Sequence, residues 1–101
     1  MATIIWTKKA THQFEKAVRY INETQGKYYA EIVLNAIFNK VDMLETHPLI
    51  GTKEPKLAHK KSEYRYLVVW SYKIIYRLSS ENQKVTISRV FHTSQHPRKL
   101  W

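Results

Sequence analysis

The sequence predicts an α+β fold in which a helical hairpin packs on one face of a mostly antiparallel, twisted sheet, in the order β-α-α-β-β-β. Three observations support this prediction. Apolar residues recur at helical spacing from residue 10 to residue 44, with an interruption at Gly26. The final third of the chain alternates runs rich in Tyr, Val and Ile with short turns, and a separate β-branched segment opens the chain. We expect one domain over residues 1–101, because a chain of this length supports one hydrophobic core.

The first strand is expected over residues 2–6, where Ala-Thr-Ile-Ile-Trp is rich in β-branched side chains. Thr7 is the expected N-cap of the first helix, because its hydroxyl can accept a hydrogen bond from an unpaired backbone N–H. Gly26 is expected to end this helix, since glycine can adopt the left-handed conformation of a C-terminal cap. The second helix is expected over residues 27–46. The short glycine-containing turn between them predicts an antiparallel helical hairpin.

A lysine-rich loop is expected over residues 47–63. Three strands are expected at residues 64–70, 73–78 and 84–92, joined by connections of two and five residues. Connections this short require antiparallel neighbours, whereas the first strand returns through the helical hairpin and can pair with a later strand. We therefore expect the helices on one face of the sheet and a cleft on the other.

Positive charge is concentrated in the second half of the chain. The whole sequence has 17 Lys and Arg against 8 Asp and Glu, a net charge of +9. Residues 1–52 hold 6 basic and 5 acidic side chains, whereas residues 53–101 hold 11 basic and 3 acidic ones. A field concentrated in this way attracts anionic partners and favours contacts to phosphate. We therefore expect a polyanionic or acidic partner.

The composition argues against several classes of site. The absence of Cys excludes a disulfide framework and a thiolate metal site, and it fits a cytoplasmic protein. No apolar run approaches the roughly 20 residues of a membrane helix, so no membrane partner is expected. The few carboxylates of the basic half are too widely spaced for a two-metal nuclease. His92 and His96 have metal-ligand spacing without a third ligand, and two glycines cannot supply a phosphate-binding loop. We expect no metal and no cofactor.

After these exclusions, the chemistry that the sequence still allows is metal-independent acid–base cleavage of a phosphodiester. For RNA, this chemistry needs a base near the 2′-OH, cations on the scissile phosphate and an acid for the leaving oxygen. Glu54 is the candidate base and His92 the candidate acid. The candidate phosphate-holding cations are Arg65, Lys73, Arg77 and Arg89. Further candidates for RNA contact are Lys56, Lys60, Lys61 and Arg98, and the candidate stacking residues are Tyr64, Tyr66, Trp70 and Tyr72.

Each of these residues also has a structural explanation. His92 ends the last expected strand, Glu54 lies in a loop, and about half of the aromatic residues are expected in the sheet core. In a regular strand, Arg89 and His92 point to opposite faces. They share a site only if a bulge or the strand end redirects one of them.

Several segments resemble one family when taken in their order and spacing: Pro48-x-x-Gly51 after the helices, Tyr64-Arg65 at the start of a strand, Tyr72-Lys73-Ile74-Ile75-Tyr76, and Arg89-Val90-Phe91-His92. The chain resembles the RelE/ParE superfamily of bacterial toxins from type II toxin–antitoxin systems, which includes plasmid stabilisation proteins. The resemblance covers nearly the whole chain. It implies a RelE/ParE-like fold and a small toxin that is neutralised by a cognate antitoxin wrapped over the helices and sheet.

The resemblance leaves two branches open. RelE- and YoeB-like toxins cut mRNA in the ribosomal A site without a metal, whereas ParE-like toxins inhibit DNA gyrase. The segment Gly51-x-x-Glu54-Pro55-x-Leu57 is similar to the YoeB-like segment that supplies a glutamate base. Lys73 stands in the place of that branch's phosphate-binding arginine, and His92 lies near its terminal histidine.

The chain also departs from the YoeB-like pattern. Lys73 in place of arginine loses bidentate phosphate geometry, and Thr93 follows His92 where that branch has a tyrosine. The long helical hairpin and Pro48-x-x-Gly51 also suit the ParE branch. We expect a ribosome-dependent mRNA endoribonuclease, with the ribosome and mRNA as partners. The alternatives are a ParE-like inhibitor of DNA gyrase and an inactive member that mainly binds an antitoxin.

Overall fold

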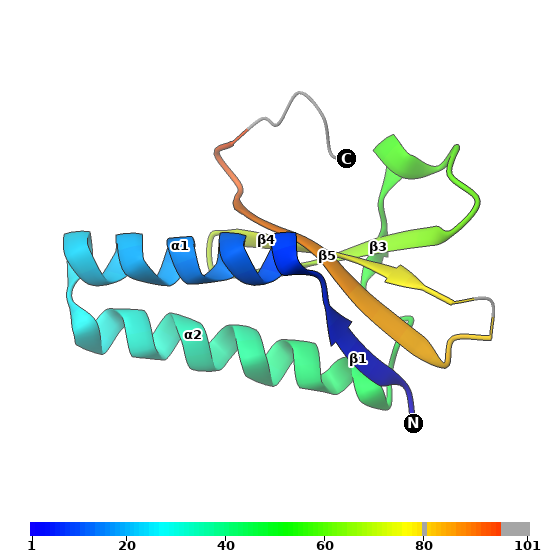
Figure 1. Ribbon diagram of the computed structural model, residues 1–101, viewed down its shortest axis with the longest axis horizontal. Helices are drawn as coiled ribbons and strands as arrows, with labels where there is room; N and C mark the ends of the chain where they lie inside the picture. The colour runs from blue at the N-terminus through cyan, green and yellow to red at the C-terminus, as the bar shows by residue number, and fades with distance from the viewer. Residues whose placement is uncertain (80, 96–101) are drawn as a thin grey trace.

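The computed structural model describes residues 1–79 and 81–95. In this part of the chain, two long helices cover one face of a five-stranded sheet with the strand order β1-β5-β4-β3-β2 (Figure 1). The sheet is antiparallel except for the parallel pair β1–β5. This arrangement confirms the predicted α+β fold. The elements are β1 (Thr3–Trp6), α1 (Lys8–Gln25), α2 (Lys27–Asp42), β2 (Thr52–Lys53), β3 (Glu63–Val69), β4 (Tyr72–Leu78) and β5 (Lys84–His92).

Local signals set both ends of α1. The Thr7 hydroxyl accepts a hydrogen bond of 3.0 Å from the Ala10 backbone N–H, which confirms the predicted N-cap. Gly26 separates the helices, and its φ of 98° and ψ of 159° lie in a region that is open almost only to glycine. The glycine therefore ends α1 as predicted, but in a more extended conformation than the left-handed cap.

Replacing Thr7 with alanine is expected to lower the free energy of unfolding by about 1 kcal/mol, the typical cost of losing an N-cap side chain. Urea unfolding followed by circular dichroism measures this loss. Thr11, exposed in the same helix, offers the matched control, because Thr11→Ala keeps the cap and improves helix propensity. Equal unfolding midpoints for Thr7→Ala and the wild-type chain would contradict the prediction.

From α2 onward, the structure differs from the sequence prediction in three places. Helix α2 ends at Asp42 and continues as a 3-10 turn, Met43–Glu45, where the pattern predicted α-helix to residue 46. The predicted loop over residues 47–63 contains the two-residue strand β2 and a second 3-10 turn, Pro55–Leu57. The β3–β4 turn lies one residue earlier than predicted and gives Trp70 a positive φ of 55°.

The two faces of the sheet differ in character. Alternate residues of the strands pack against the helices, among them Ile74 and Tyr76, which are fully buried. We call the other side of the sheet the open face. Its residues are Tyr64, Tyr66 and Val68 of β3, Lys73, Ile75 and Arg77 of β4, and Thr86, Arg89 and Phe91 of β5.

A bulge lies in the middle of β5. Ile75 pairs with Arg89 and Tyr76 pairs with Ile87, so Ser88 is an extra residue in the ladder. Its hydroxyl donates to the Ile75 carbonyl oxygen at 3.1 Å. The bulge places Thr86 and Arg89 on the same face, although their spacing would separate them in a regular strand.

The loop that leaves the helices is tied to the sheet through Tyr76. The Tyr76 hydroxyl donates to the Pro48 carbonyl oxygen and accepts from the Gly51 N–H, both at 2.9 Å. Burial raises the pKa of Tyr76 above its usual value, chiefly because the ionised form would lose its hydration. A Cβ on Gly51 would lie 2.5 Å from the Tyr76 hydroxyl oxygen and 2.8 Å from the Tyr66 carbonyl oxygen. Only glycine fits here, and the contact explains the glycine of the Pro48-x-x-Gly51 motif.

No helix in the described part of the chain has the length and apolar character to cross a membrane.

Candidate functional site

The candidate base and one candidate phosphate-binding cation meet on the open face. Glu54 caps the turn Pro55–Leu57, and its carboxylate accepts a hydrogen bond from the Lys56 N–H at 3.3 Å. The Lys73 Nζ lies 2.7 Å from Glu54 Oε1 and 4.2 Å from the centre of the Tyr66 ring. Glu54 is 3% exposed. The carboxylate and the ammonium group therefore neutralise each other in a largely buried ion pair.

The segment that carries Glu54 also fills the centre of the open face. Ile75 points away from the helices yet is fully buried, and Glu54 and Leu57 are buried as well. The cleft predicted for this face is therefore occupied at its centre by the segment after β2.

His92 lies on the other side of the sheet. It pairs with Tyr72 across β4 and β5, and the two rings meet edge to face with centroids 5.3 Å apart. Tyr72 belongs to the core packed against the helices, whereas Lys73 pairs with Phe91 on the open face. The His92 Nδ1 accepts from the Ser94 N–H at 3.0 Å. The bulge precedes both Arg89 and His92, so these two side chains keep the opposite directions of a regular strand.

Arg65 holds the loop before β2. Its guanidinium donates to the carbonyl oxygens of Leu49 and Gly51 at 3.1 and 2.6 Å and pairs with Glu63. Its position in the register, opposite Tyr76, places it apart from the Lys73 side of β4. The partners of Arg65 are therefore two loop carbonyl oxygens and Glu63, and the structure does not bring Arg65 to the Glu54–Lys73 pair.

The other candidate cations surround the open face. Arg77 is exposed, whereas Arg89 is partly buried and donates to the Ser88 carbonyl oxygen at 2.7 Å. Burial lowers the pKa of Arg89 from its usual value, and the charge of ionised Tyr64 acts in the opposite direction. Lys56, Lys60 and Lys61 are exposed on and after the turn Pro55–Leu57, and Arg98 lies outside the described residues.

The candidate stacking residues do not form one surface. Tyr64 and Tyr66 are partly buried on the open face, while Trp70 is exposed in the β3–β4 turn and contacts the Tyr29 ring. Tyr72 is buried against the helices, and burial raises its pKa. Only Tyr64 and Tyr66 of these four aromatic residues therefore lie on the open face, and the Tyr66 ring already contacts the Lys73 ammonium group.

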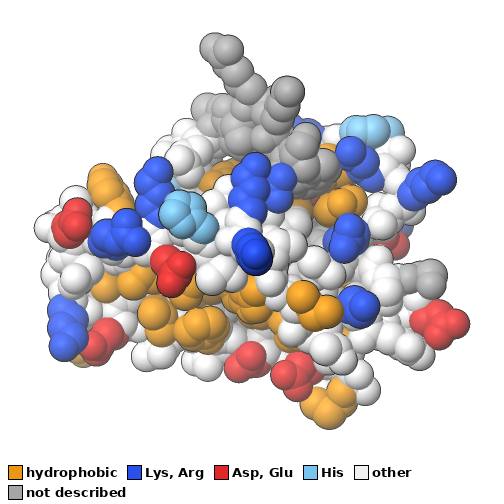
Figure 2. Space-filling view, in the orientation of Figure 1, with side chains coloured by type: hydrophobic (Ala, Val, Ile, Leu, Met, Phe, Trp, Pro, Cys, Tyr) orange, Lys and Arg blue, Asp and Glu red, His pale blue; other side chains and the backbone are white. Residues whose placement is uncertain are grey.

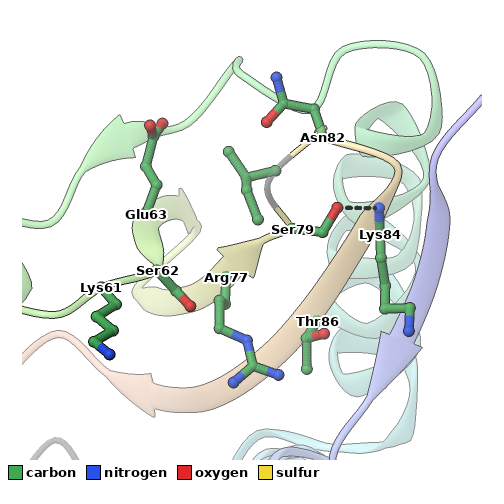
Figure 3. A pocket seen from close by; sticks show the side chains of 9 residues that line it. Lys61, Ser62, Glu63, Arg77, Ser79, Asn82, Lys84 and Thr86 are labelled. Atoms are coloured by element: carbon green, nitrogen blue, oxygen red, sulfur yellow. Dashed lines mark hydrogen bonds between the residues drawn. The ribbon is translucent and has the colours of Figure 1, made fainter.

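A hollow of about 470 Å³ lies at the other end of the open face (Figure 3). It contains Lys61 and Arg77, which were candidates from the sequence, and it adds residues that sequence reasoning missed. The alternation of β5 could have indicated Lys84 and Thr86, which share a face. The residues around the hollow are Lys61, Ser62, Glu63, Arg77, Leu78, Ser79, Asn82, Lys84 and Thr86.

The helix side has a different surface. Figure 2 shows hydrophobic side chains gathered along the line between the two helices. Here the ring of Phe14 lies 5.5 Å from that of Trp6 and 5.2 Å from that of Phe38, which is 41% exposed. Among the described residues, no three His, Asp or Glu side chains gather in a way that could hold a metal ion.

Comparisons with known proteins agree with this architecture. The family model described as the ParE toxin of the type II toxin-antitoxin system parDE matches residues 4–97. Among solved structures, the chain is similar to one from the chromosomal ParDE system of P. aeruginosa, with 19% identity and a TM-score of 0.72 over 91% of this chain and 96% of that one. It is also similar to one from the toxin–antitoxin complex RelBE2 of Mycobacterium tuberculosis, with 22% identity and a TM-score of 0.54 over 90% and 96%.

These two structural similarities support the fold, and no curated protein sequence matches the chain. The family model carries the assignment, because it spans nearly all of the sequence. It confirms the resemblance to the RelE/ParE superfamily that the sequence motifs indicated. The chain belongs to the family of ParE toxins of type II toxin–antitoxin systems.

Proposed function

We propose that this toxin acts by binding its target and not by cleaving RNA, and that its target is DNA gyrase in the cytoplasm. The family match favours the ParE branch, for which the resemblance of the sequence implies gyrase inhibition. A cognate antitoxin is the expected neutralising partner. The apolar line between the helices supports this partnership, because exposed aromatic side chains in a small protein commonly mark protein interfaces.

The observation that carries this proposal is the separation of the acid–base set. General acid–base catalysis requires both groups within hydrogen-bond reach of the reacting atoms. Glu54 is buried and paired with Lys73 on the open face, whereas His92 stacks against Tyr72 on the helix side. Arg65 donates to loop carbonyl oxygens. The carboxylate of the candidate base is therefore occupied by the Lys73 ammonium group, and the candidate acid lies on the opposite side of the sheet.

Inducible expression of the wild-type chain and of His92→Ala tests the proposal. We expect growth arrest in both strains, with a DNA damage response, and we expect purified toxin to inhibit supercoiling by gyrase. If the toxin acts by binding and does not use the imidazole, the toxicity of His92→Ala should stay within about twofold of the wild-type value. If His92 were a general acid, its loss would lower the cleavage rate about 100-fold or more. His12→Ala, an exposed histidine of α1, is the matched control.

An endoribonuclease would give a different result in the same experiment. Codon-phased cuts in mRNA on translating ribosomes, lost in His92→Ala and kept in His12→Ala, would overturn the binding mechanism. Ordinary growth on induction, together with tight antitoxin binding, would identify an inactive member of the family.

An mRNA endoribonuclease is the second candidate, and one contact favours it. Glu54 and Lys73 are 2.7 Å apart on a basic, tyrosine-containing face, so a carboxylate that could serve a ribose 2′-OH lies beside a cation that could bind a phosphate. In this mechanism an RNA phosphate would take Lys73 away from Glu54 and free the carboxylate to act as a base. The mapping of mRNA ends described above distinguishes the two candidates.

A further inference from the structure

We propose that the hollow around Arg77 and Lys84 is an oxyanion site that binds a phosphodiester group of a nucleic-acid strand. The site is separate from the Glu54–Lys73 pair and does not depend on which target the toxin has. Arg77 and Lys73 are four residues apart on β4, a separation of about 13 Å at the usual strand rise. The hollow can therefore bind an anion without disturbing the ion pair.

The chemistry of the lining fits a phosphate oxygen. Three cationic side chains, Lys61, Arg77 and Lys84, line the hollow. Guanidinium and ammonium groups are the usual phosphate-binding groups in proteins, and hydroxyl and amide groups complete such sites. The neutral hydrogen-bonding side chains of the lining are Ser62, Ser79, Asn82 and Thr86.

The positive charge of the hollow is not compensated within the described residues. No carboxylate there forms an ion pair with Lys61, Arg77 or Lys84, in contrast to the pairing of Lys73 with Glu54. Glu63, the one acidic residue of the lining, is paired with Arg65. Figure 3 shows its carboxylate pointing away from the Arg77 guanidinium. An incoming anion would therefore meet a net positive site.

The backbone holds this lining in place. Arg77 and Thr86 are direct cross-strand partners, and Lys84 lies two residues before Thr86 on the same side of β5. The Ser79 hydroxyl oxygen accepts hydrogen bonds of 3.0 Å from the N–H groups of Gln83 and Lys84, which fixes the start of β5 against the end of β4 (Figure 3). Arg77, Lys84 and Thr86 thus project from strands, whose backbone needs little ordering when an anion binds, whereas Lys61, Ser62, Ser79 and Asn82 come from the adjoining loops.

Binding of labelled 12-nucleotide DNA and RNA strands of one sequence, measured by fluorescence anisotropy at several salt concentrations, tests the proposal. We expect the double variant Arg77→Gln/Lys84→Gln to bind both strands about tenfold more weakly at low salt, because it loses charge-assisted hydrogen bonds to the phosphate. We also expect the slope of log K against log salt to fall by about 0.7, the value for one phosphate contact on a single strand. Inorganic phosphate should shift the amide NMR signals of Asn82, Lys84 and Thr86.

A charge-matched variant separates a site from a general field. Lys9→Gln/Lys16→Gln removes the same charge from the exposed surface of α1. Equal losses in both double variants would overturn the proposal, because they would show that only the net charge matters. Tighter binding of a polyglutamate peptide than of either strand would also overturn it and would assign the hollow to an acidic protein segment. Unfolding midpoints within the error of the wild-type chain verify that both variants are folded.

Discussion

Replacing Lys73 with methionine is expected to lower the free energy of unfolding by about 3 kcal/mol, because it leaves the carboxylate of Glu54 buried without a counter-charge. Glu54 is 3% exposed, so water cannot replace the lost ammonium group without opening the segment that covers the sheet. The Lys73 side chain is itself 23% exposed, and this places the loss at the lower end of the range for buried pairs. The Tyr66 ring also loses its contact with the ammonium group.

A double-mutant cycle measures this effect. Glu54→Gln keeps an acceptor for the Lys56 N–H and removes the charge, so the double variant Glu54→Gln/Lys73→Met should recover most of the stability that Lys73→Met loses. Lys53→Met, on the exposed strand β2, is the matched control and should change stability by no more than about 0.5 kcal/mol. Additive losses in urea unfolding would contradict the expected coupling between the two residues.

Replacing Gly51 with alanine is expected to lower the free energy of unfolding by about 3 kcal/mol, the upper part of the usual range for inserting atoms into a packed core. The new Cβ would lie 2.5 Å from the Tyr76 hydroxyl oxygen. That hydroxyl cannot move away cheaply, since it is hydrogen-bonded to both Pro48 and Gly51 in a fully buried position. The Tyr66 carbonyl oxygen would lie 2.8 Å from the same Cβ, and Tyr66 is held by its pairing with Thr52 in the β2–β3 ladder.

Tyr76→Phe identifies the cause of the Gly51→Ala effect. Alone, it leaves the Pro48 carbonyl and the Gly51 N–H without their partner and should cost about 2 kcal/mol. Combined with Gly51→Ala, it removes the atom nearest to the new methyl group, so the double variant should lose less than the sum of the two single losses. Urea unfolding of the four chains measures the difference. A wild-type midpoint for Gly51→Ala would contradict the steric explanation.

The parts of the fold that could be predicted from the sequence are those with local causes. The Thr7 hydroxyl caps a helix from its own neighbourhood, and Gly26 takes a conformation that few other residues can adopt. Strand β2 could not be predicted, because two residues carry no periodicity and their hydrogen bonds depend on Arg65 and Tyr66 of a distant segment. The β3–β4 turn was displaced because Trp70, which lacks the usual preference for positive φ, occupies a position that normally favours Gly or Asn.

In the candidate site, too, features with local causes could be predicted and features that depend on distant segments could not. Strand alternation alone predicted that Arg89 and His92 point to opposite faces, and they do. The contact between Glu54 and Lys73 depends on how a loop folds over the sheet, which no spacing rule gives. The bulge at Ser88 has no Gly or other local signal, yet it decides that Thr86 and Arg89 share a face.

The parallel pairing of β1 with β5 has a consequence for how the chain folds. Thr3 pairs with Lys84, so this contact closes most of the chain into a loop, whereas a turn of two residues joins β3 to β4. Closing a loop of this length costs roughly 4 kcal/mol of chain entropy before any contact is gained. Contacts of such large separation slow folding, while the helical hairpin and the β3–β4 hairpin are local and form cheaply. During synthesis, the sheet cannot be completed until β5, its last strand in the sequence, has left the ribosome.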